Sequence, residues 1–325
     1  MDTLALRSLP PLGVLRDDGT LDPAHTGTIS EELAVALYEH MVVARTLDER
    51  VVALQREGVV TQYASAAGEE AAILGAVAAL NDDDWVFPSS REIAAALWRG
   101  MPLAAVAHHL FGTADDAAKG RDAPHSPFWR KAHIASTSPL VGTQIPHAVG
   151  FAWAAQMQGQ SLATLVFFGE GATSTGDFHA GLNFAGVTRA PVVALCRNNG
   201  WAMTTPVSRQ TASDGIAVKS VAYGLDGVQV DGTDIVAVLS VVRAARQRAV
   251  AGHGGTLIEA IIPGLASADP LARTREHLEA RNLWSGHREE DLRREVRTDV
   301  DRVFSEALSA AKPGRNTLFD DVYAH

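Results

Sequence analysis

The sequence predicts an α/β protein built on a doubly wound parallel sheet, and three features of the chain support this class. Apolar runs of strand length occur at 165–168 and 191–196, without the polar alternation of half-exposed strands. Amphipathic stretches of helical period separate the runs from one another. Further strand-like runs at 227–230 and 256–262 flank a predicted helix at 235–251. An alternation of strand and helix is the pattern of a parallel sheet covered on both faces.

A chain of 325 residues corresponds to about two domains by length alone, although α/β folds of this size often form one, and we expect a single domain spanning residues 1–325. We find no internal repeat and no low-complexity linker that would mark a boundary. No apolar run approaches a membrane span and no secretory signal is evident, so we expect a cytoplasmic protein without membrane contact. The formal charge is −10 with no basic block, which argues against a nucleic-acid partner. The single cysteine, Cys196, lies in an apolar run and is interpreted as a core residue.

The N-terminal third begins with a segment, 1–28, that is rich in proline, glycine and aspartate and is predicted to be an extended arm. Ser30 can cap a helix, and Glu31 and Glu32 are acids of the kind favoured in a first helical turn. The apolar spacing predicts that this helix continues to about residue 55. The next helix is predicted to open at the glycine-glutamate-glutamate turn at 68–70.

A short strand is expected at 85–87, followed by a polar turn that contains Arg91 and by a helix through Gly100. Arg91 is either an ordinary surface arginine or a ligand for an anion. The segment 115–131 has little periodicity, and loops of this length in compact domains are often functional. It contains His125. His108 and His109 fall in an apolar helical pattern, where packing or surface exposure is expected.

The segment 165–206 carries the clearest chemical signal. A buried strand ends at Gly169, and Glu170 and Gly171 form a tight turn before a helix. The following strand runs into Arg197 and Asn199. Because strands of an open parallel sheet deliver their carboxyl ends to one crevice, we expect the two turns to lie side by side.

These residue types favour a diphosphate held through a metal ion. Glycines followed by a helix N-terminus let backbone N–H groups approach an anion, and Arg197 offers a planar cation for a phosphate. Glu170 and Asn199 supply the oxygen ligands that suit Mg²⁺. A P-loop is excluded because the turn has no lysine, and a dinucleotide fingerprint is excluded because Ser174 stands where glycine is needed.

The remaining parts are expected to be helical. Small residues at 142–158 predict a helix packed closely beneath the sheet. From 271 to 325 the pattern is helical and charged, and the charges at 288–301 are interpreted as a solvated face rather than a docking site.

The segment 169–206 resembles the thiamine diphosphate motif, which begins Gly-Asp-Gly and ends in Asn-Asn. More closely, it resembles the alpha subunit of the decarboxylase (first) component of 2-oxo acid dehydrogenases, which are oxidoreductases, and especially the branched-chain type. The likeness covers most of the chain and implies the thiamine diphosphate-binding fold. It also includes Leu47-Asp48-Glu49-Arg50, Ala67-Gly68-Glu69-Glu70, Asp84-Trp85-Val86-Phe87-Pro88, Ser138-Pro139-Leu140, Thr143-Gln144-Ile145-Pro146 and Phe319-Asp320-Asp321-Val322-Tyr323.

The resemblance implies thiamine diphosphate and Mg²⁺ as cofactors, and it implies a set of site residues. A potassium ion is implied near Thr143 and Gln144, and His125 corresponds to a loop histidine with a catalytic role. The implied metal ligands are Glu170, Asn199 and the backbone carbonyl of Trp201. The implied cofactor contacts are Arg91, Ser138, Pro139, Leu140, Gly169, Glu170, Gly171, Ala172, Arg197 and Asn199.

The resemblance also implies the reaction and the partners. The family decarboxylates a 2-oxo acid and transfers the acyl group to lipoamide. A separate beta subunit supplies the glutamate that activates the cofactor, so we expect an alpha2-beta2 heterotetramer that is inactive without beta. A lipoyl-bearing acyltransferase is a further expected partner.

Three departures from the family pattern leave alternatives open. Glu170 stands where the motif has aspartate, and Ser90 replaces a tyrosine before Arg91. The loop 261–270 is short and lacks the histidine that assists acyl transfer. The chain could therefore serve a two-component decarboxylase or carboligase with a non-lipoyl acceptor, or it could be a degenerate scaffold subunit. The resemblance implies a 2-oxo acid of the branched-chain or pyruvate-like kind.

Overall fold

The computed structural model describes residues 11–16, 18–25, 27–126, 128–136 and 139–320. Its centre is a five-stranded sheet in which every neighbouring pair is parallel and the strand order is β1-β2-β3-β7-β6. The predicted α/β class with a parallel sheet is confirmed. The strands are β1 (Trp85–Phe87), β2 (Thr164–Gly169), β3 (Val192–Asn198), β6 (Asp226–Asp231) and β7 (Thr256–Ile261).

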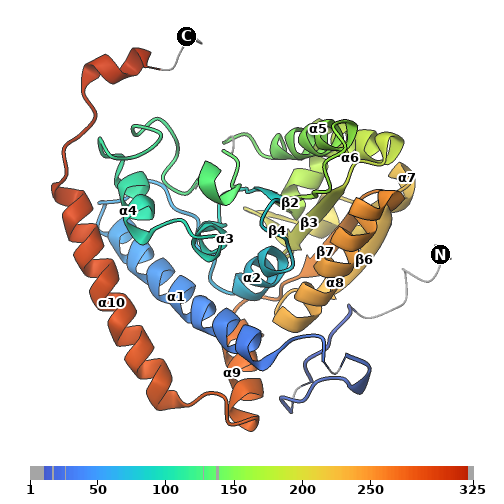
Figure 1. Ribbon diagram of the computed structural model, residues 1–325, viewed down its shortest axis with the longest axis horizontal. Helices are drawn as coiled ribbons and strands as arrows, with labels where there is room; N and C mark the ends of the chain where they lie inside the picture. Colours follow the sequence, from blue (N-terminus) through green and yellow to red (C-terminus); the bar gives the residue numbers. More distant parts are fainter. Residues whose placement is uncertain (1–10, 17, 26, 127, 137–138, 321–325) are drawn as a thin grey trace.

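Both faces of the sheet are buried, which explains the unbroken apolar runs in the sequence. Successive residues of β2 contribute to opposite faces: Leu165 and Phe167 join one core cluster, and Val166 and Phe168 join the other. Helices α5 (Gln144–Met157) and α6 (Gly176–Thr188) cover one face, and α8 (Ile235–Arg248) covers the other (Figure 1). The sheet is therefore doubly wound, as predicted.

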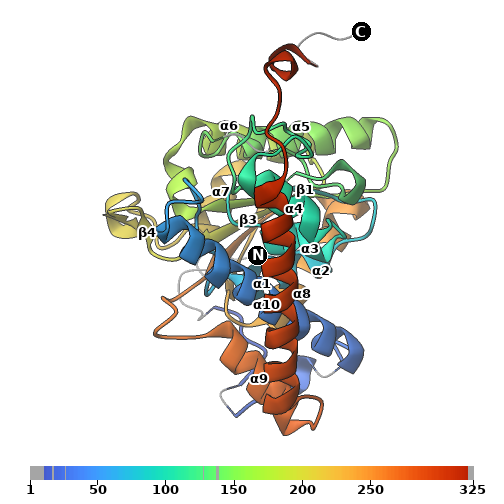
Figure 2. The same cartoon turned by 90° about the vertical axis from the view of Figure 1, so that its left-hand side faces the viewer.

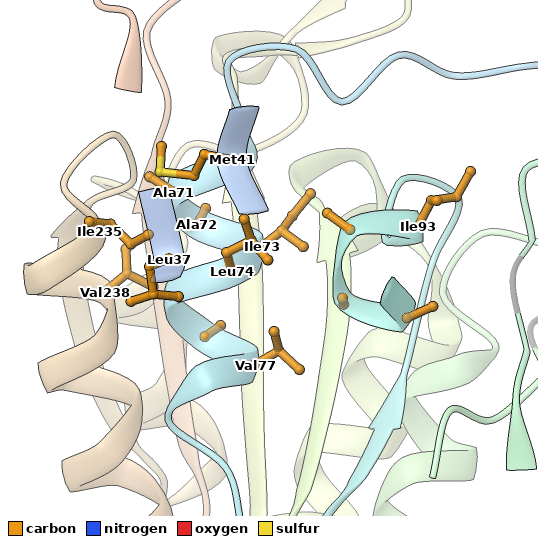
Figure 3. Packing of buried hydrophobic residues seen from close by; sticks show 14 of the residues in the cluster. Leu37, Met41, Ala71, Ala72, Ile73, Leu74, Val77, Ile93, Ile235 and Val238 are labelled. Atoms are coloured by element: carbon orange, nitrogen blue, oxygen red, sulfur yellow. The ribbon is translucent and has the colours of Figure 1, made fainter. Parts of the chain in front are cut away.

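Helix α2 (Glu70–Ala78) is an apolar helix sandwiched between other helices (Figure 3). Its Ala71, Ile73 and Leu74 pack among Leu37, Met41, Ile235 and Val238 of the neighbouring helices. Gly75 is required here, because a Cβ at this position would lie 2.9 Å from the carbonyl oxygen of Ile235. This close packing fixes the N-terminal end of α2, where Glu69 lies.

A layer of helices lies outside α2. Helix α1 (Glu31–Arg56) begins after Ser30, whose hydroxyl accepts the N–H of Leu33, as the sequence predicts. Helix α10 (Gly286–Ser309) forms a long rod that packs against α1 (Figure 2). The buried Tyr38 hydroxyl donates to Glu289 at 2.6 Å and joins the two helices.

The described part of the N-terminal arm lies along the edge of the sheet. Leu12 forms a parallel bridge with Val230 of β6. The buried carboxylate of Asp234 accepts the backbone N–H groups of Val14 and Leu15, both at 2.6 Å. These contacts tie the arm to the start of α8. The assignment of the whole chain to one domain stays a prediction.

The remaining elements connect the strands and the main helices. One helix ends earlier than expected: α8 stops at Arg248, and a wider turn follows with Gly252 at φ 83°. The long loop predicted before residue 131 is present. In the described residues no helix is long and apolar enough to cross a membrane. The other elements are α3 (Ile93–Trp98), α4 (Leu103–Phe111), α7 (Ser220–Tyr223), α9 (Pro270–Ala280) and the hairpin strands β4 (Trp201–Ala202) and β5 (Thr205–Pro206).

Candidate functional site

The turns that follow β2 and β3 lie side by side at the carboxyl edge of the sheet. Gly169, the last residue of β2, is in register with Arg197 of β3. Glu170 follows directly in a short 3-10 turn, and Asn199 follows the end of β3. The expected meeting of these two turns is confirmed.

Glu170 is a buried carboxylate, with 2% of its surface exposed. Burial raises its pKa, and the negative charge of Glu69 adds to this effect. Hydrogen bonds from the backbone N–H groups of Glu170 itself and of Asn199, and from the side chain of Gln210, lower the pKa only in part. Oε1 of Glu170 has no hydrogen-bond partner among the described residues. A buried carboxylate oxygen without a donor is chemically suited to a cation.

The asparagine turn is held in shape by its own side chains. Oδ1 of Asn198 accepts the N–H of Gly200 at 2.9 Å, and Gly200 has φ 86°, a conformation that favours glycine. Oδ1 of Asn199 accepts the N–H of Trp201 at 3.1 Å. The amide of Asn198 donates to the buried Glu259 at 2.7 Å. The turn is thus anchored to β7 as well as to β3.

Gly171 lies where the turn and the β4–β5 hairpin approach each other most closely. A Cβ on Gly171 would meet the Cβ of Ala202 at 2.7 Å, so a side chain does not fit there. Gly169 is different, because its nearest neighbour would be the carbonyl oxygen of Arg197 at 4.0 Å. Ala172 is buried behind the turn.

Arg197 lies beneath the site and is 4% exposed. Its Nη1 is 2.5 Å from Glu69, and its Nη2 is 2.5 Å from Glu92 and 2.7 Å from the hydroxyl of Ser89. Burial alone would lower the pKa of Arg197, but the carboxylates of Glu92 and Glu69 raise it. Both terminal nitrogens are therefore occupied by protein groups, and a contact between Arg197 and a diphosphate stays a prediction.

Arg91 reaches the same carboxylate from the other side. Its Nη1 is 2.6 Å from Oε1 of Glu69, and its side chain is one-third exposed. The Nε of Arg91 has no hydrogen-bond partner within the described residues. Arg91 lines a hollow of about 360 Å³ together with residues of the segments 67–69, 199–203 and 262–265. The guanidinium group of Arg91 is therefore partly exposed, and it lines the same hollow as Asn199.

The segment before α5 contains three predicted cofactor contacts, of which the structure describes two. Pro139 and Leu140 are exposed, and Ser138 lies outside the described residues. A Cβ on Gly142 would meet the Thr175 hydroxyl at 2.5 Å, so the segment packs on the residue that caps α6.

The pair predicted to bind potassium lies at the start of α5. Gln144 is buried and donates to the carbonyl of Phe167 at 2.9 Å, whereas Thr143 donates to the carbonyl of Leu140 at 3.0 Å. Both residues are donors in these contacts. Their hydroxyl and amide oxygens therefore keep the capacity to face a cation.

His125 is mostly buried in the long loop, and its Nδ1 is 3.4 Å from the carbonyl oxygen of Gln62. Burial lowers its pKa, which favours the neutral imidazole. His125 is not among the described residues that line the hollow. His109 is buried, as the apolar pattern allows, and its Nδ1 is 3.0 Å from Asp116. A catalytic role for His125 stays a prediction.

The shortened loop after β7 closes one side of the hollow with apolar groups. Ile262 donates its N–H to the carbonyl of Asn198 at 2.8 Å, which ties the loop to the asparagine turn. Leu265 packs on Gly68 at the start of α2. Asp269 ends the loop by capping α9 at Leu271. Leu265 lines the hollow. The loop between β7 and α9 contains no histidine.

Three residues of the site were not recognised from the sequence: Glu69, Glu92 and Ser89. Each is buried or half-buried and binds Arg197. Glu69 belongs to the Ala-Gly-Glu-Glu stretch and Glu92 follows Arg91 directly. Glu92 stands next to the predicted anion ligand Arg91, but no local pattern links Glu69 or Ser89 to Arg197.

Comparison with known proteins gives one family match and several close relatives. A family model described as the dehydrogenase E1 component matches residues 38–262. The chain is 37% identical to a mitochondrial 2-oxoisovalerate dehydrogenase subunit alpha 2 of Arabidopsis thaliana, over 97% of this chain and 72% of that protein. It is 34% identical to the corresponding alpha subunit of Bos taurus, over 95% and 72%. It is 38% identical to a 3-methyl-2-oxobutanoate dehydrogenase subunit alpha of Mycobacterium tuberculosis, over 94% and 91%.

Proposed function

This chain belongs to the dehydrogenase E1 component family, and from this premise we propose which of its residues hold the cofactor and what they do. It is an alpha subunit of a thiamine diphosphate-dependent 2-oxo acid dehydrogenase, and its reaction is the decarboxylation of a 2-oxo acid. A beta subunit is its partner. The scaffold and non-lipoyl alternatives are not favoured by these relatives.

The residues at the carboxyl edge of the sheet fit a diphosphate bound through a divalent metal. The observation that carries this proposal is the buried Oε1 of Glu170, which has no partner among the described residues. Glu170 and Asn199 would hold Mg²⁺, with the carbonyl of Trp201 as a further ligand.

Arg91 would bind the diphosphate oxygens, because its guanidinium lies at the hollow and is partly open. Gly171 lets the turn approach the hairpin and keeps a side chain out of this region. When bound, thiamine diphosphate supplies the carbon nucleophile and the electron sink that decarboxylation needs. The task of this chain is to bind the diphosphate end and to orient the cofactor.

Several finer features belong to the same proposal. We expect K⁺ near Thr143 and Gln144, a role for His125 near the reacting groups, and an alpha2-beta2 assembly that is inactive without beta. The acyl group would pass to a lipoyl-bearing acyltransferase, although the loop 262–269 lacks the histidine of the family pattern.

A branched-chain 2-oxo acid is the proposed substrate because the relatives are named for one. Cytoplasmic location stays a prediction.

The test is the release of CO₂ from 3-methyl-2-oxobutanoate by this chain together with its beta-type partner. We expect release to depend on thiamine diphosphate and on Mg²⁺, and pyruvate to be a poorer substrate. Acylation of an added lipoyl domain tests the acceptor in the same samples. A complex that binds the cofactor but releases no CO₂ from any 2-oxo acid would contradict the proposal.

A further inference from the structure

Glu69 connects the two arginines of the site. It precedes α2 and is 5% exposed. Its Oε1 lies 2.6 Å from Nη1 of Arg91, and its Oε2 lies 2.5 Å from Nη1 of Arg197. One buried carboxylate thus binds two guanidinium groups, one with each oxygen.

The next residue, Glu70, performs a different task. Its Oε1 lies 2.5 Å from Nε of Arg45 on α1, and its Oε2 accepts the N–H of Gly68 at 2.8 Å. Glu70 therefore joins α2 to α1 and closes its own turn. Of the two consecutive glutamates, only Glu69 contacts Arg91 and lines the hollow.

The two arginines bound to Glu69 differ in exposure. Arg197 is fully enclosed and gives its other terminal nitrogen to Glu92 and Ser89. Arg91 is one-third exposed, and its Nη2 forms no ion pair with Glu69. The Nε atoms of both arginines lack a hydrogen-bond partner in the described part of the chain. Glu92 thus holds Arg197, Arg197 holds Glu69, and Glu69 in turn holds Arg91 at the hollow.

We propose that Glu69 is a positioning residue, which holds the guanidinium of Arg91 in place to receive the diphosphate. This inference rests on the proposed function. A free arginine side chain loses about 2 kcal/mol of rotamer entropy when it is immobilised, and a side chain that is already held avoids part of this cost on binding. Arg91 and Arg197 together balance the charges of Glu69 and Glu92, so the cluster carries no net negative charge that would repel the anion.

The test compares Glu69→Gln with Glu70→Gln in the complex with the beta-type partner. Glutamine has the same shape, but it presents one acceptor oxygen and one NH₂ group, which can only donate, so one arginine loses its partner. We expect Glu69→Gln to raise the Kd for thiamine diphosphate in Mg²⁺ by about tenfold, which corresponds to about 1.4 kcal/mol. Glu70→Gln makes the same chemical change one residue away, and it should leave the Kd within about twofold while lowering the unfolding temperature.

A double-mutant cycle with Arg91→Gln separates positioning from general destabilisation. If Glu69 acts through Arg91, the change Glu69→Gln alters the Kd by less than about twofold once Arg91 is already glutamine. Additive effects on the Kd, or a Kd for Glu69→Gln equal to that of the wild type, would overturn the inference and leave the proposed function intact. Failure of the wild-type complex to bind thiamine diphosphate at all would overturn both.

Discussion

Oε2 of Glu69 and Nη1 of Arg197 lie 2.5 Å apart, although 128 residues separate them in the chain. The pair links the start of α2 to the carboxyl end of β3, and both residues are buried. A buried pair of this kind is costly to break from one side, because the remaining charge loses its partner. The contact therefore ties the helical layer to the strand edge on which the cofactor site is built.

Replacing Glu170 with glutamine tests its role as a metal ligand. The change removes a buried charge that has an unpartnered oxygen, so the metal-free protein should unfold at the same or a slightly higher temperature. In the wild type, Mg²⁺ with thiamine diphosphate at about 100 times its Kd should add about 2.7 kcal/mol to the stability. The variant should show no such gain. Thermal unfolding of the complex, with and without both ligands, measures this, and an unchanged gain would exclude Glu170 from the site.

The turn glycines provide a matched pair of substitutions. Gly171→Ala introduces a Cβ at 2.7 Å from that of Ala202 and should destabilise the protein by about 1–3 kcal/mol. Gly169→Ala meets only the carbonyl oxygen of Arg197 at 4.0 Å and should change the stability of the cofactor-free protein by less than about 1 kcal/mol. Denaturant unfolding of the two variants compares them directly. Equal destabilisation would show that the approach of the hairpin to Gly171 is not a constraint.

His109 predicts a pH dependence of stability in the long loop. Its Nδ1 faces Asp116 and its Nε2 faces the carbonyl of Ala123, so both nitrogens meet acceptors only when the ring is protonated. Burial by itself lowers the pKa of His109, but Asp116 raises it above the ordinary value, and Asp122 adds to the increase. The stabilisation is therefore complete below the ordinary pKa of histidine and is lost as the pH rises through the raised value.

The variant His109→Gln should accordingly be less stable than the wild type at mildly acidic pH, and the difference should shrink as the pH becomes alkaline. Urea unfolding of both proteins across this range gives the measurement. Asp116→Asn removes the acceptor carboxylate and is expected to reduce the pH dependence in the same way. A difference that grows with rising pH would contradict the assigned protonation.

The regular elements were largely predictable from the sequence, because their signals are local. The strand 85–87 and the helix after Ser30 begin where the pattern places them, and β2 and β3 lie within two residues of their predicted ends. The meeting of the turns at Glu170 and Asn199 also followed, since neighbouring parallel strands end at a common edge.

The polar partners were not predictable, because they depend on contacts between distant segments. Nothing in local spacing indicates that Arg197 binds Glu69 and Glu92. The sequence therefore predicted an arginine whose guanidinium group is available to a phosphate. In the same way, the apolar pattern around His109 indicated packing or exposure but could not identify Asp116. Such contacts arise from how the long loop and α2 pack, which short-range periodicity does not encode.

The most direct test of the account is a calorimetric titration of thiamine diphosphate into the complex of this chain with its beta-type partner, with and without Mg²⁺. Binding should require the metal, because the ionised Glu170 carboxylate has no donor for the diphosphate and can engage it only through a cation. Binding with the same affinity in the absence of Mg²⁺, or no binding by an intact complex, would contradict this account.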